Sequence, residues 1–545
     1  MKMNTGLTCL RSVLLASLVC LISACKPTPP AEVPDTILVN GKVLTVDKDF
    51  SVANALAIKG ARILAVGTDQ VIRAMADGKT RVIDVQGKTV IPGLIDNHMH
   101  FIRAAQRWNL QARIDGISSR AEALAIISKK AASLPPGAWL MVQGGWHENQ
   151  FSDKPGGFTL EELDAAAPKN PLFLQVTYFT VYANTLALKA VGVNPNTGAR
   201  HDGPPLISPQ PPYGALNEKM PTVSQEQLEQ NLMDWIATLN RSGLTSVYDV
   251  GRPPEGDLAL LTKMSAKGPL PLRIWNTLKY EAYDPKGTDA AIELINKTKV
   301  NTSDDYLGTI GLGEHLYLPF FDLPNLTKPY GEDVVSEFMK VATAAATHGF
   351  NVQEHTMLDM TINSILGPME ELNKKVSLKP LRWNLAHVLT FSEPNIRRAA
   401  ALGLTAGVHS VAMYGSKEQQ PPIRAIQDSG MVWGLGTDST IVSAYQPFLT
   451  LGWVVSGKSM NGQTVIDKPV TREEALIAHT RSNAFLLFKE KDLGTLEAGK
   501  LADLVVLDKD YMTVPPDDIF TIRPVMTMVG GRVVFDASAG TPEQK

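Results

Sequence analysis

The sequence predicts an α/β protein in which a (β/α)8 TIM-type barrel carries a small β-sandwich, built from both chain ends, and an inserted lid subdomain. Three observations predict this fold. Eight short apolar runs in the middle of the chain each end at or near a polar residue. Amphipathic helical patterns accompany most of these runs, and two of them stop at glycine. Both chain ends instead show short strand patterns separated by tight-turn residues.

The N-terminal segment, residues 1–24, has the layout of a signal peptide, with a basic start, an apolar run and small residues before Cys25. The string Ile22-Ser23-Ala24-Cys25 resembles a bacterial lipobox, in which the cysteine becomes the lipidated first residue. An ordinary cleaved signal with an incidental cysteine is the alternative. Residues 25–34 are proline-rich and predict an extended tether. We therefore expect an exported lipoprotein, facing the periplasm or the cell exterior, that meets the membrane only through its lipid anchor.

Composition narrows the classes of function. The formal net charge is −3 and no basic block occurs, which argues against a nucleic-acid partner. The three cysteines are Cys9, Cys20 and Cys25, so a chain cleaved at Cys25 has no cysteine in its folded body for a metal site or a nucleophile. We expect a small-molecule substrate. The sequence is compatible with a homodimer as well as with a monomer.

Residues 35–90 predict the first part of the β-sandwich. Turn signals at Asn40-Gly41, Lys59-Gly60 and Gln86-Gly87 each predict a hairpin. Residues 491–545 predict the second part and a tail, with strand patterns on both sides of Gly530-Gly531. The alternative is two unrelated β-flaps.

Residues 91–490 predict the barrel. Helices are expected at 224–240, 332–348 and 393–402, and the last two are followed by the helix-stop residues Gly349 and Gly403. The carboxyl ends of barrel strands form the active face, so the polar ends of the runs favour a site there. The eight predicted strands are Ile91–His100, Leu244–Asp249, Leu272–Thr277, Ile310–His315, Phe350–His355, Leu381–His387, Leu404–His409 and Val432–Asp438.

An insertion at about 109–220 follows the first predicted strand. A long loop on the active face of a barrel is a natural lid, although a purely stabilising role is the alternative. Trp146, Tyr178, Phe179 and Tyr182 could form an aromatic wall against the substrate or the core of the lid itself. Trp146 is the candidate substrate contact among them.

His98 and His100 begin the candidate metal site. Residues two apart on a strand point the same way, so both imidazoles can reach one ion. Imidazole and carboxylate ligands suit zinc and similar divalent ions. Each further candidate has a plain alternative, such as a core histidine, a helix N-cap or a buried ion pair. These further candidates, each at or near a strand end, are Glu314, His355, His387 and Asp438.

Several motifs resemble the amidohydrolase superfamily. The string IPGLIDNHMH at 91–100 is similar to its P-G-x-x-D-x-H-x-H signature, and GTLEAGKLAD at 494–503 resembles the segment that re-enters the β-sandwich. GGWHE at 144–148 and EELDAAAP at 161–168 resemble lid motifs of the YtcJ-like, family-3 branch, which includes N-substituted formamide deformylase. The resemblance covers nearly the whole chain after residue 35.

The resemblance implies a divalent-metal site, with zinc the first choice. Many relatives carry a fourth-strand lysine whose carbamate bridges two ions, whereas this chain offers Glu314, so one or two ions are both compatible. The ligands that the resemblance implies are His98, His100, His355, His387 and Asp438.

The implied activity is hydrolysis of a non-peptide C–N bond, in an amide, a cyclic amide or a formamide, by metal-activated water. Asp438 would accept the proton of the water and pass it to the leaving nitrogen. His409, at the end of the seventh strand, is expected to face the substrate. One alternative is a lactonase or phosphotriesterase in the same barrel, and another is a non-catalytic exported binding or regulatory lipoprotein.

Overall fold

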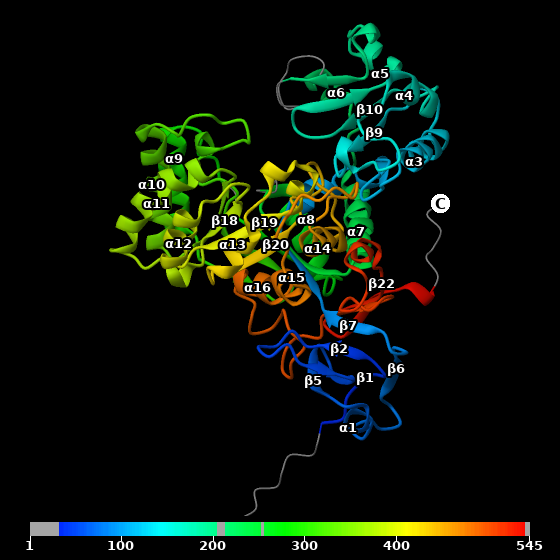
Figure 1. Cartoon of the computed structure of the whole chain (residues 1–545), viewed down its shortest axis with the longest axis vertical. Coiled ribbons are helices and arrows are strands. Elements are labelled where there is room, and N and C mark those ends of the chain that lie inside the picture. The colour runs from blue at the N-terminus through cyan, green and yellow to red at the C-terminus, as the bar shows by residue number, and fades with distance from the viewer. Residues whose placement is uncertain (1–31, 204–212, 252–254, 279, 540–545) are drawn as a thin grey trace, which may run out of the picture.

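The computed structural model describes residues 32–203, 213–251, 255–278 and 280–539. The barrel lies in the middle of the molecule, the insertion stands at one end and the β-sandwich at the opposite end (Figure 1). The signal peptide, Cys25 and most of the tether lie outside the described residues. None of the helices in the described ranges combines the length and apolarity needed to cross a membrane.

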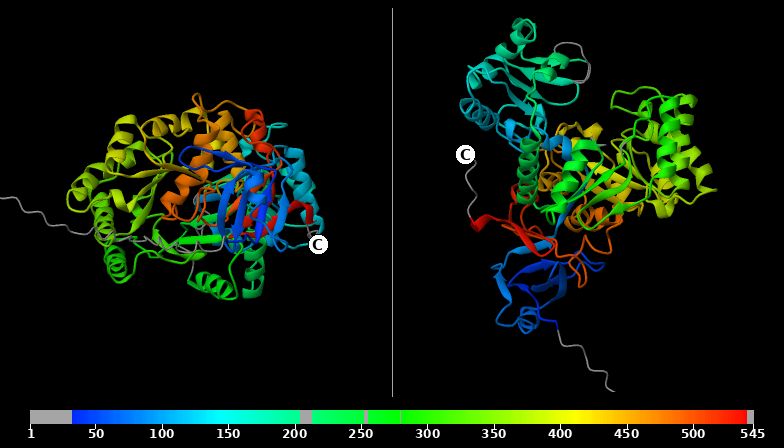
Figure 2. Two further views of the ribbon diagram at one scale, coloured as in Figure 1. Left: turned by 90° about the horizontal axis from the view of Figure 1, so that it is seen from below. Right: turned by 180° about the vertical axis from the view of Figure 1, so that it is seen from behind.

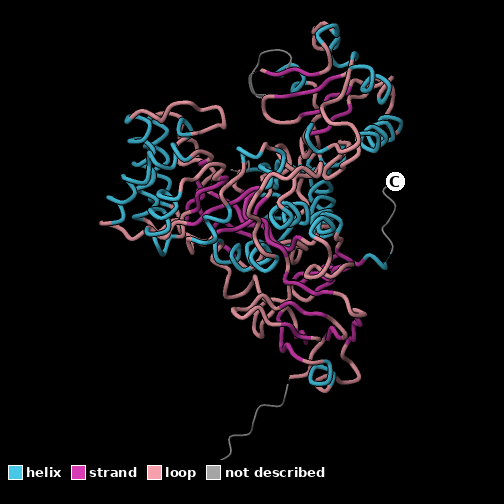
Figure 3. The backbone as a smooth tube through the Cα atoms, in the orientation of Figure 1, coloured by secondary structure: helices cyan, strands magenta, loops and turns pink. Residues whose placement is uncertain are grey.

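Eight parallel strands form the barrel and confirm the predicted fold class (Figure 3). Each of the eight apolar runs contains or overlaps one of these strands, because runs buried on both sides are continuously apolar. Their order around the barrel is β8 (Leu94–Met99), β13 (Leu244–Asp249), β14 (Arg273–Thr277), β16 (Leu307–Leu312), β17 (Asn351–Thr356), β18 (Asn384–His387), β19 (Thr405–His409) and β20 (Trp433–Gly436).

Two backbone hydrogen bonds join the first and last barrel strands. The Asp438 amide donates to the His98 carbonyl at 2.8 Å, and the His100 amide donates to the Ser439 carbonyl at 3.0 Å. The ladder pairs the other seven neighbours, and these two bonds join the carboxyl ends of β8 and β20. Three of the residues that form this seam are therefore candidate ligands.

The helices that follow the strands lie on the outside of the barrel (Figure 2). The predicted helices are observed as α7 (Gln225–Arg241), α10 (Glu332–Thr347) and α12 (Glu393–Ala401). A reciprocal pair of hydrogen bonds between Ser224 and Gln227 caps the start of α7. The remaining helices after strands are α8 (Glu255–Ala266), α9 (Pro285–Lys297), α11 (Asp359–Asn373), α13 (Ile423–Asp428) and α14 (Pro447–Ser456).

Both chain ends contribute to one six-stranded sheet. Within it β21 (Leu504–Leu507) pairs antiparallel with β7 (Thr89–Pro92), which leads directly into the barrel. As predicted, β22 (Pro524–Val529) and β23 (Arg532–Asp536) form a hairpin around Gly530-Gly531. A long-range antiparallel pairing thus fixes the start of the first barrel strand.

Two of the three predicted N-terminal hairpins are wrong. The Lys59-Gly60 turn does join paired strands, β4 (Ala55–Lys59) and β5 (Arg62–Gly67). The strands β4 and β5 belong to a four-stranded sheet of the β-sandwich. At Asn40-Gly41 and at Gln86-Gly87, however, the chain leaves that sheet and enters the six-stranded one. The two corners lie side by side, because the Gly87 amide donates to the Asn40 carbonyl at 2.6 Å. Both sites use positive φ, which permits a corner as well as a hairpin.

The insertion has a sheet and an apolar core of its own. The predicted helix is α3 (Arg120–Ala132), and the sheet has the order β12 (Arg200–Asp202), β11 (Thr180–Ala183), β10 (Leu172–Gln175) and β9 (Leu140–Gln143). Apolar side chains from the helix and the sheet bury one another. The insertion is therefore a folded subdomain that emerges from the carboxyl end of β8.

Candidate metal centre

His98, His100 and Asp438 meet at the seam between β8 and β20. His98 Nε2 lies 3.6 Å and His100 Nε2 lies 3.1 Å from Asp438 Oδ1. One ligand atom from each of the three lies within 4.8 Å of the others. Three groups from two strand ends therefore offer ligand atoms to one position.

Glu314 lies among all four predicted histidine ligands. Its carboxylate oxygens lie 2.7 Å from His355 Nδ1 and 3.1 Å from His387 Nε2. They also lie 3.5 Å from His100 Nε2 and 3.8 Å from His98 Nε2. The carboxylate thus stands between the candidate ligands of the β8–β20 seam and those of β17 and β18.

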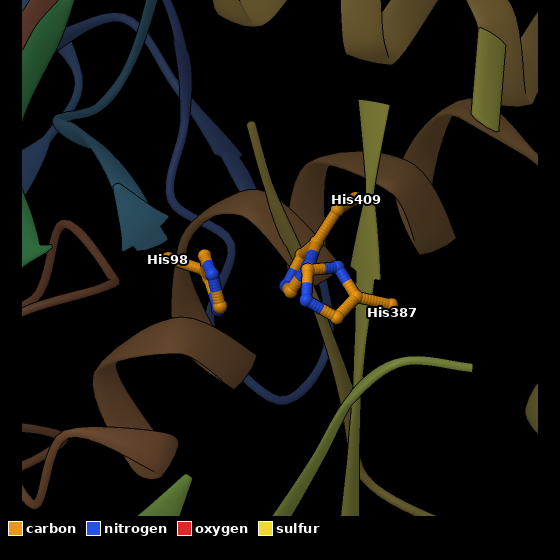
Figure 4. Close-up of side chains that lie close together, drawn as sticks. All are labelled: His98, His387 and His409. Carbon is orange, nitrogen blue, oxygen red and sulfur yellow. The ribbon is translucent and has the colours of Figure 1, made fainter. Parts of the chain in front are cut away.

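His409 belongs to the same cluster. Its Nδ1 lies 2.8 Å from His387 Nδ1, and its ring centroid lies 4.2 Å from that of His98 (Figure 4). Its side chain is buried, so it lies among the candidate ligands rather than apart from them on an outer wall. Sequence reasoning placed His409 at a strand end but did not place it in contact with His387.

The backbone at this mouth is unusual. His387 has φ +73° and Asp438 has φ +57°, a region that non-glycine residues seldom occupy. Residues held in such conformations concentrate at functional sites, where the surrounding structure over-determines them. Two candidate ligands on different strands share this feature.

Asp96 fixes the geometry of the seam. Its carboxylate accepts hydrogen bonds from the His98 amide at 3.0 Å and from the Thr437 amide at 3.1 Å. The Thr437 hydroxyl also donates to it at 2.6 Å. Burial raises the pKa of Asp96 to about 7. Asp96 therefore holds the two strands together directly behind the candidate ligands.

Asp322 contacts His355 through Nε2, whereas Glu314 contacts it through Nδ1. Sequence analysis did not identify Asp322. His355 Nε2 donates to the Asp322 carbonyl at 2.8 Å and lies 3.3 Å from its carboxylate. The Met357 and Leu358 amides each donate to that carboxylate at 2.9 Å. Metal-binding histidines usually donate their second ring N–H in this way. Asp322 lies in a loop between a strand and a helix, and no sequence pattern marks it.

Two buried imidazoles, those of His98 and His409, are suited to ligation because they favour the neutral form. Burial lowers the pKa of His98 to about 3, and burial followed by the charges of His98 and His387 also lowers the pKa of His409. Neutral imidazole is the form that binds metal. His98 Nδ1 and Nε2, His100 Nδ1 and His409 Nε2 are buried without a hydrogen-bond partner. Buried polar atoms without partners are rare, so this donor set fits a divalent cation.

The carboxylates stay ionised. Burial opposes the ionised form of Glu314, but hydrogen bonds from His355 and His387 hold its pKa well below the usual value. Burial also opposes ionisation of Asp438, but the hydrogen bond from His100 outweighs burial and lowers the pKa of Asp438. Against the effect of its burial, hydrogen bonds with Asp322 and then with Glu314 raise the pKa of His355 to about 10. His355 thus carries a proton whose charge a divalent cation would replace.

Two residues of the predicted aromatic wall, Trp146 and Tyr178, lie in different surroundings. Trp146 is buried in the insertion core, where its indole N–H donates to the Gln175 carbonyl at 2.9 Å, so the structure does not bring it to the metal centre. Tyr178 lies near the centre instead. Burial raises the pKa of Tyr178 to about 12; among the smaller influences, Arg103 lowers this pKa and the charges of Asp438 and Glu314 raise it. Of the predicted aromatic wall, Tyr178 therefore lies close enough to the centre to sense the charges of its carboxylates.

Comparisons with known proteins agree with this geometry. A family model described as "Amidohydrolase family" matches residues 81–535. The chain is 25% identical over 550 residues to an N-substituted formamide deformylase of Arthrobacter pascens, covering 92% of this chain and 98% of that protein. It is 25% identical to the putative amidohydrolase YtcJ of Bacillus subtilis, covering 84% of this chain and 91% of that protein.

Solved structures share the fold at low sequence identity. An uncharacterised metal-dependent hydrolase from Pyrococcus furiosus superposes with a TM-score of 0.58 at 20% identity, over 88% of this chain and 100% of that one. An adenosine deaminase from Xanthomonas campestris with bound zinc gives a TM-score of 0.54 at 14% identity, over 93% and 94% of the two chains. These likenesses support the barrel architecture.

Proposed function

This chain belongs to the amidohydrolase family and is a metal-dependent hydrolase of carbon–nitrogen bonds, and we propose that its substrates are linear amides, cyclic amides or formamides. The observation that carries the proposal is the cluster at the barrel mouth. There, two buried carboxylates have imidazole partners, and several ring nitrogens have none. Its relationship to a formamide deformylase over nearly the full length of both chains supports the substrate class.

We propose that the cluster would hold two divalent ions, of which zinc is the first choice, and that Glu314 would contribute a ligand to both. His98, His100 and Asp438 would hold one ion, and His355 and His387 the other. His409 either ligates or orients His387 through the contact between their Nδ1 atoms. When bound, a divalent ion supplies Lewis acidity, which polarises a carbonyl group and lowers the pKa of water towards neutrality.

Asp438 is the residue that moves the proton in this proposal. Its carboxylate is ionised, lies at the mouth and is fixed by the seam behind it. It accepts a proton from the attacking water and then donates that proton to the leaving nitrogen, acting as base and then as acid. Glu314 is less suited to this role because four imidazoles surround its oxygens.

Elemental analysis combined with a chelator-controlled substrate panel tests the proposal. We expect about two equivalents of zinc per chain and hydrolysis of N-acyl or formamide compounds that stops on chelation and returns with zinc. A panel in which only lactones or organophosphates are hydrolysed would contradict the C–N assignment. A protein that takes up no divalent metal and hydrolyses nothing would instead support a binding or regulatory role. One tightly held equivalent would overturn the bridging role of Glu314.

We also propose that the protein is exported and that Cys25 is lipidated. The order of the basic start, the apolar run and the small residues before Cys25 supports this. Cys25→Ala should move the protein from the membrane fraction to the soluble fraction and abolish its labelling by a fatty acid. An unchanged distribution would contradict a lipid anchor at this residue.

A further inference from the structure

A partly buried cation beside the metal centre has no acidic partner. Arg103 lies on α2 (Phe101–Ala105), three residues after the candidate ligand His100. Its Nη2 is buried without a hydrogen-bond partner, and among the described residues no carboxylate oxygen lies within 4.0 Å of its guanidinium. Burying a charge without a partner costs free energy, so such a group normally faces a counter-ion.

A neighbouring acidic group does not fill this role. Asp249, at the end of β13, accepts hydrogen bonds from the Ile102 and Gly251 amides, both at 2.9 Å. Its charge is near enough to Arg103 for the two to influence each other, but its oxygens face backbone donors. The Arg103 guanidinium therefore keeps a free donor group at the mouth.

The insertion supplies the other half of the site. The Arg103 Cζ atom lies 5.4 Å from the centroid of the Tyr178 ring. Tyr178 lies in the turn between β10 and β11, and its phenol stays protonated because burial raises its pKa to about 12. A phenol and a guanidinium, one from the insertion and one from the barrel, thus present hydrogen-bond donors close to the ligands of the metal centre.

We propose that Arg103 and Tyr178 bind a carboxylate group of the substrate, so that the preferred substrate is an amide or formamide that carries an anionic group. The planar guanidinium suits a carboxylate because two parallel N–H groups can reach its two oxygens. This proposal rests on the proposed function, since it names the substrate class for the same site. It assigns Arg103 to specificity, whereas the metal centre carries the hydrolysis.

Matched substrates test the proposal. Formamidoacetate and 4-formamidobutanoate would each be compared with their carboxamide counterparts, so that only the charge changes at two spacings. We expect the wild-type enzyme to prefer the carboxylate at one spacing or both by about 10- to 100-fold in kcat/KM, the value of one charge-assisted hydrogen bond. Arg103→Met should abolish this preference, because it should lower kcat/KM for the carboxylates far more than for the carboxamides.

Arg107→Met is the matched control, because Arg107 lies on the same segment and its Nε already donates to the Pro221 carbonyl at 3.0 Å. This variant should keep the preference for the carboxylate. Arg103→Lys should keep part of it, which would separate lost charge from lost folding. Equal losses on both members of each pair, or no preference in the wild-type enzyme, would overturn the proposal.

A binding measurement separates failure of this proposal from failure of the proposed function. Calorimetry on the metal-free protein would compare benzoate with benzamide. We expect benzoate to bind more tightly and Arg103→Met to remove the difference. Absence of hydrolysis with intact selectivity for benzoate would refute the proposed function alone, whereas hydrolysis of neutral amides without any selectivity for benzoate would refute the anion site alone.

Discussion

The insertion and the barrel mouth both hold carboxylates out of full contact with solvent, but they neutralise them differently. In the insertion, each of three acidic side chains contacts an arginine, in the pairs Asp115–Arg113, Glu162–Arg120 and Glu148–Arg200. At the mouth, the only cationic partners that the described residues give to Glu314 and Asp438 are imidazoles. Arginine stays charged and neutralises a carboxylate permanently, whereas an imidazole can lose its proton and leave the charge of the carboxylate to a metal ion.

The two regions also differ in the hydrogen-bond partners that they give to a histidine ring. His147 of the insertion stacks on Tyr414 with a centroid distance of 5.5 Å, and its Nδ1 accepts from the Asn149 amide at 3.1 Å. His98 of the barrel has no hydrogen-bond partner for either ring nitrogen. Partners, rather than residue type, therefore distinguish a structural histidine from a candidate ligand.

Asp438→Asn should have the largest effect on activity. Loss of the proton-transfer carboxylate should lower kcat by about 100- to 10,000-fold, the range of general acid–base catalysis. Asp202→Asn in the insertion makes the same chemical change to an acid that pairs with Arg200, and should leave kcat within about threefold. Steady-state kinetics at saturating zinc measures both. Full activity of Asp438→Asn with metal bound would remove this residue from proton transfer.

Glu314→Gln should act on metal affinity. If Glu314 is the ligand proposed above, losing its charge should weaken zinc binding by at least about 100-fold, more than the change of a residue that only supports a ligand costs. Glu148→Gln in the insertion is the control, and its zinc content should match that of the wild-type protein. Equilibrium dialysis with elemental analysis measures both variants. The comparison of the two regions fails if both variants lose zinc equally or if neither does.

His479 offers a test of acid stability outside the mouth. Its Nδ1 donates to the Ile95 carbonyl at 3.0 Å, and burial lowers its pKa to about 4. The unfolded chain therefore takes up this proton first, so its contribution to stability is complete above pH 6.5 and is lost as the pH falls towards 4.

His479→Asn should reduce the loss of unfolding free energy between pH 7 and pH 4 by up to about 3 kcal/mol, because an asparagine can still donate to the carbonyl but takes up no proton. Chemical denaturation at each pH, with zinc and with chelator, measures it. The effect should be the same in both conditions, since His479 lies outside the metal cluster. A difference that appears only without zinc would place His479 in the metal-linked set.

Gly144→Ala should give the smallest effect and tests the contact between the two regions. Gly144 has φ +66°, and a Cβ atom there would lie 2.1 Å from the Ile441 carbonyl oxygen, in the loop that follows Asp438. A shift of that loop should lower kcat by about tenfold with a smaller change in KM. Gly137→Ala is the control, because Gly137 also has positive φ but open space around it. Equal kinetics in both variants would show that the insertion does not position the loop.

The sequence alone determined the alternation of strands and helices and the polar residues at the strand ends. Burial on both sides makes a barrel strand continuously apolar, so each run was visible locally, and parallel strands bring their carboxyl ends to one face. The structure accordingly brings His98, His100, Glu314, His355, His387 and Asp438 into one cluster.

Only the tertiary structure decided which groups meet across long separations. The turn at Asn40-Gly41 has the residues of a hairpin, but burial of the strands in two sheets made it a corner. The contact of Asp322 with His355, and that of Arg103 with Tyr178, join segments that no local pattern relates. Local sequence specifies backbone conformation and periodicity, whereas partners are chosen by the burial and charge of the whole fold.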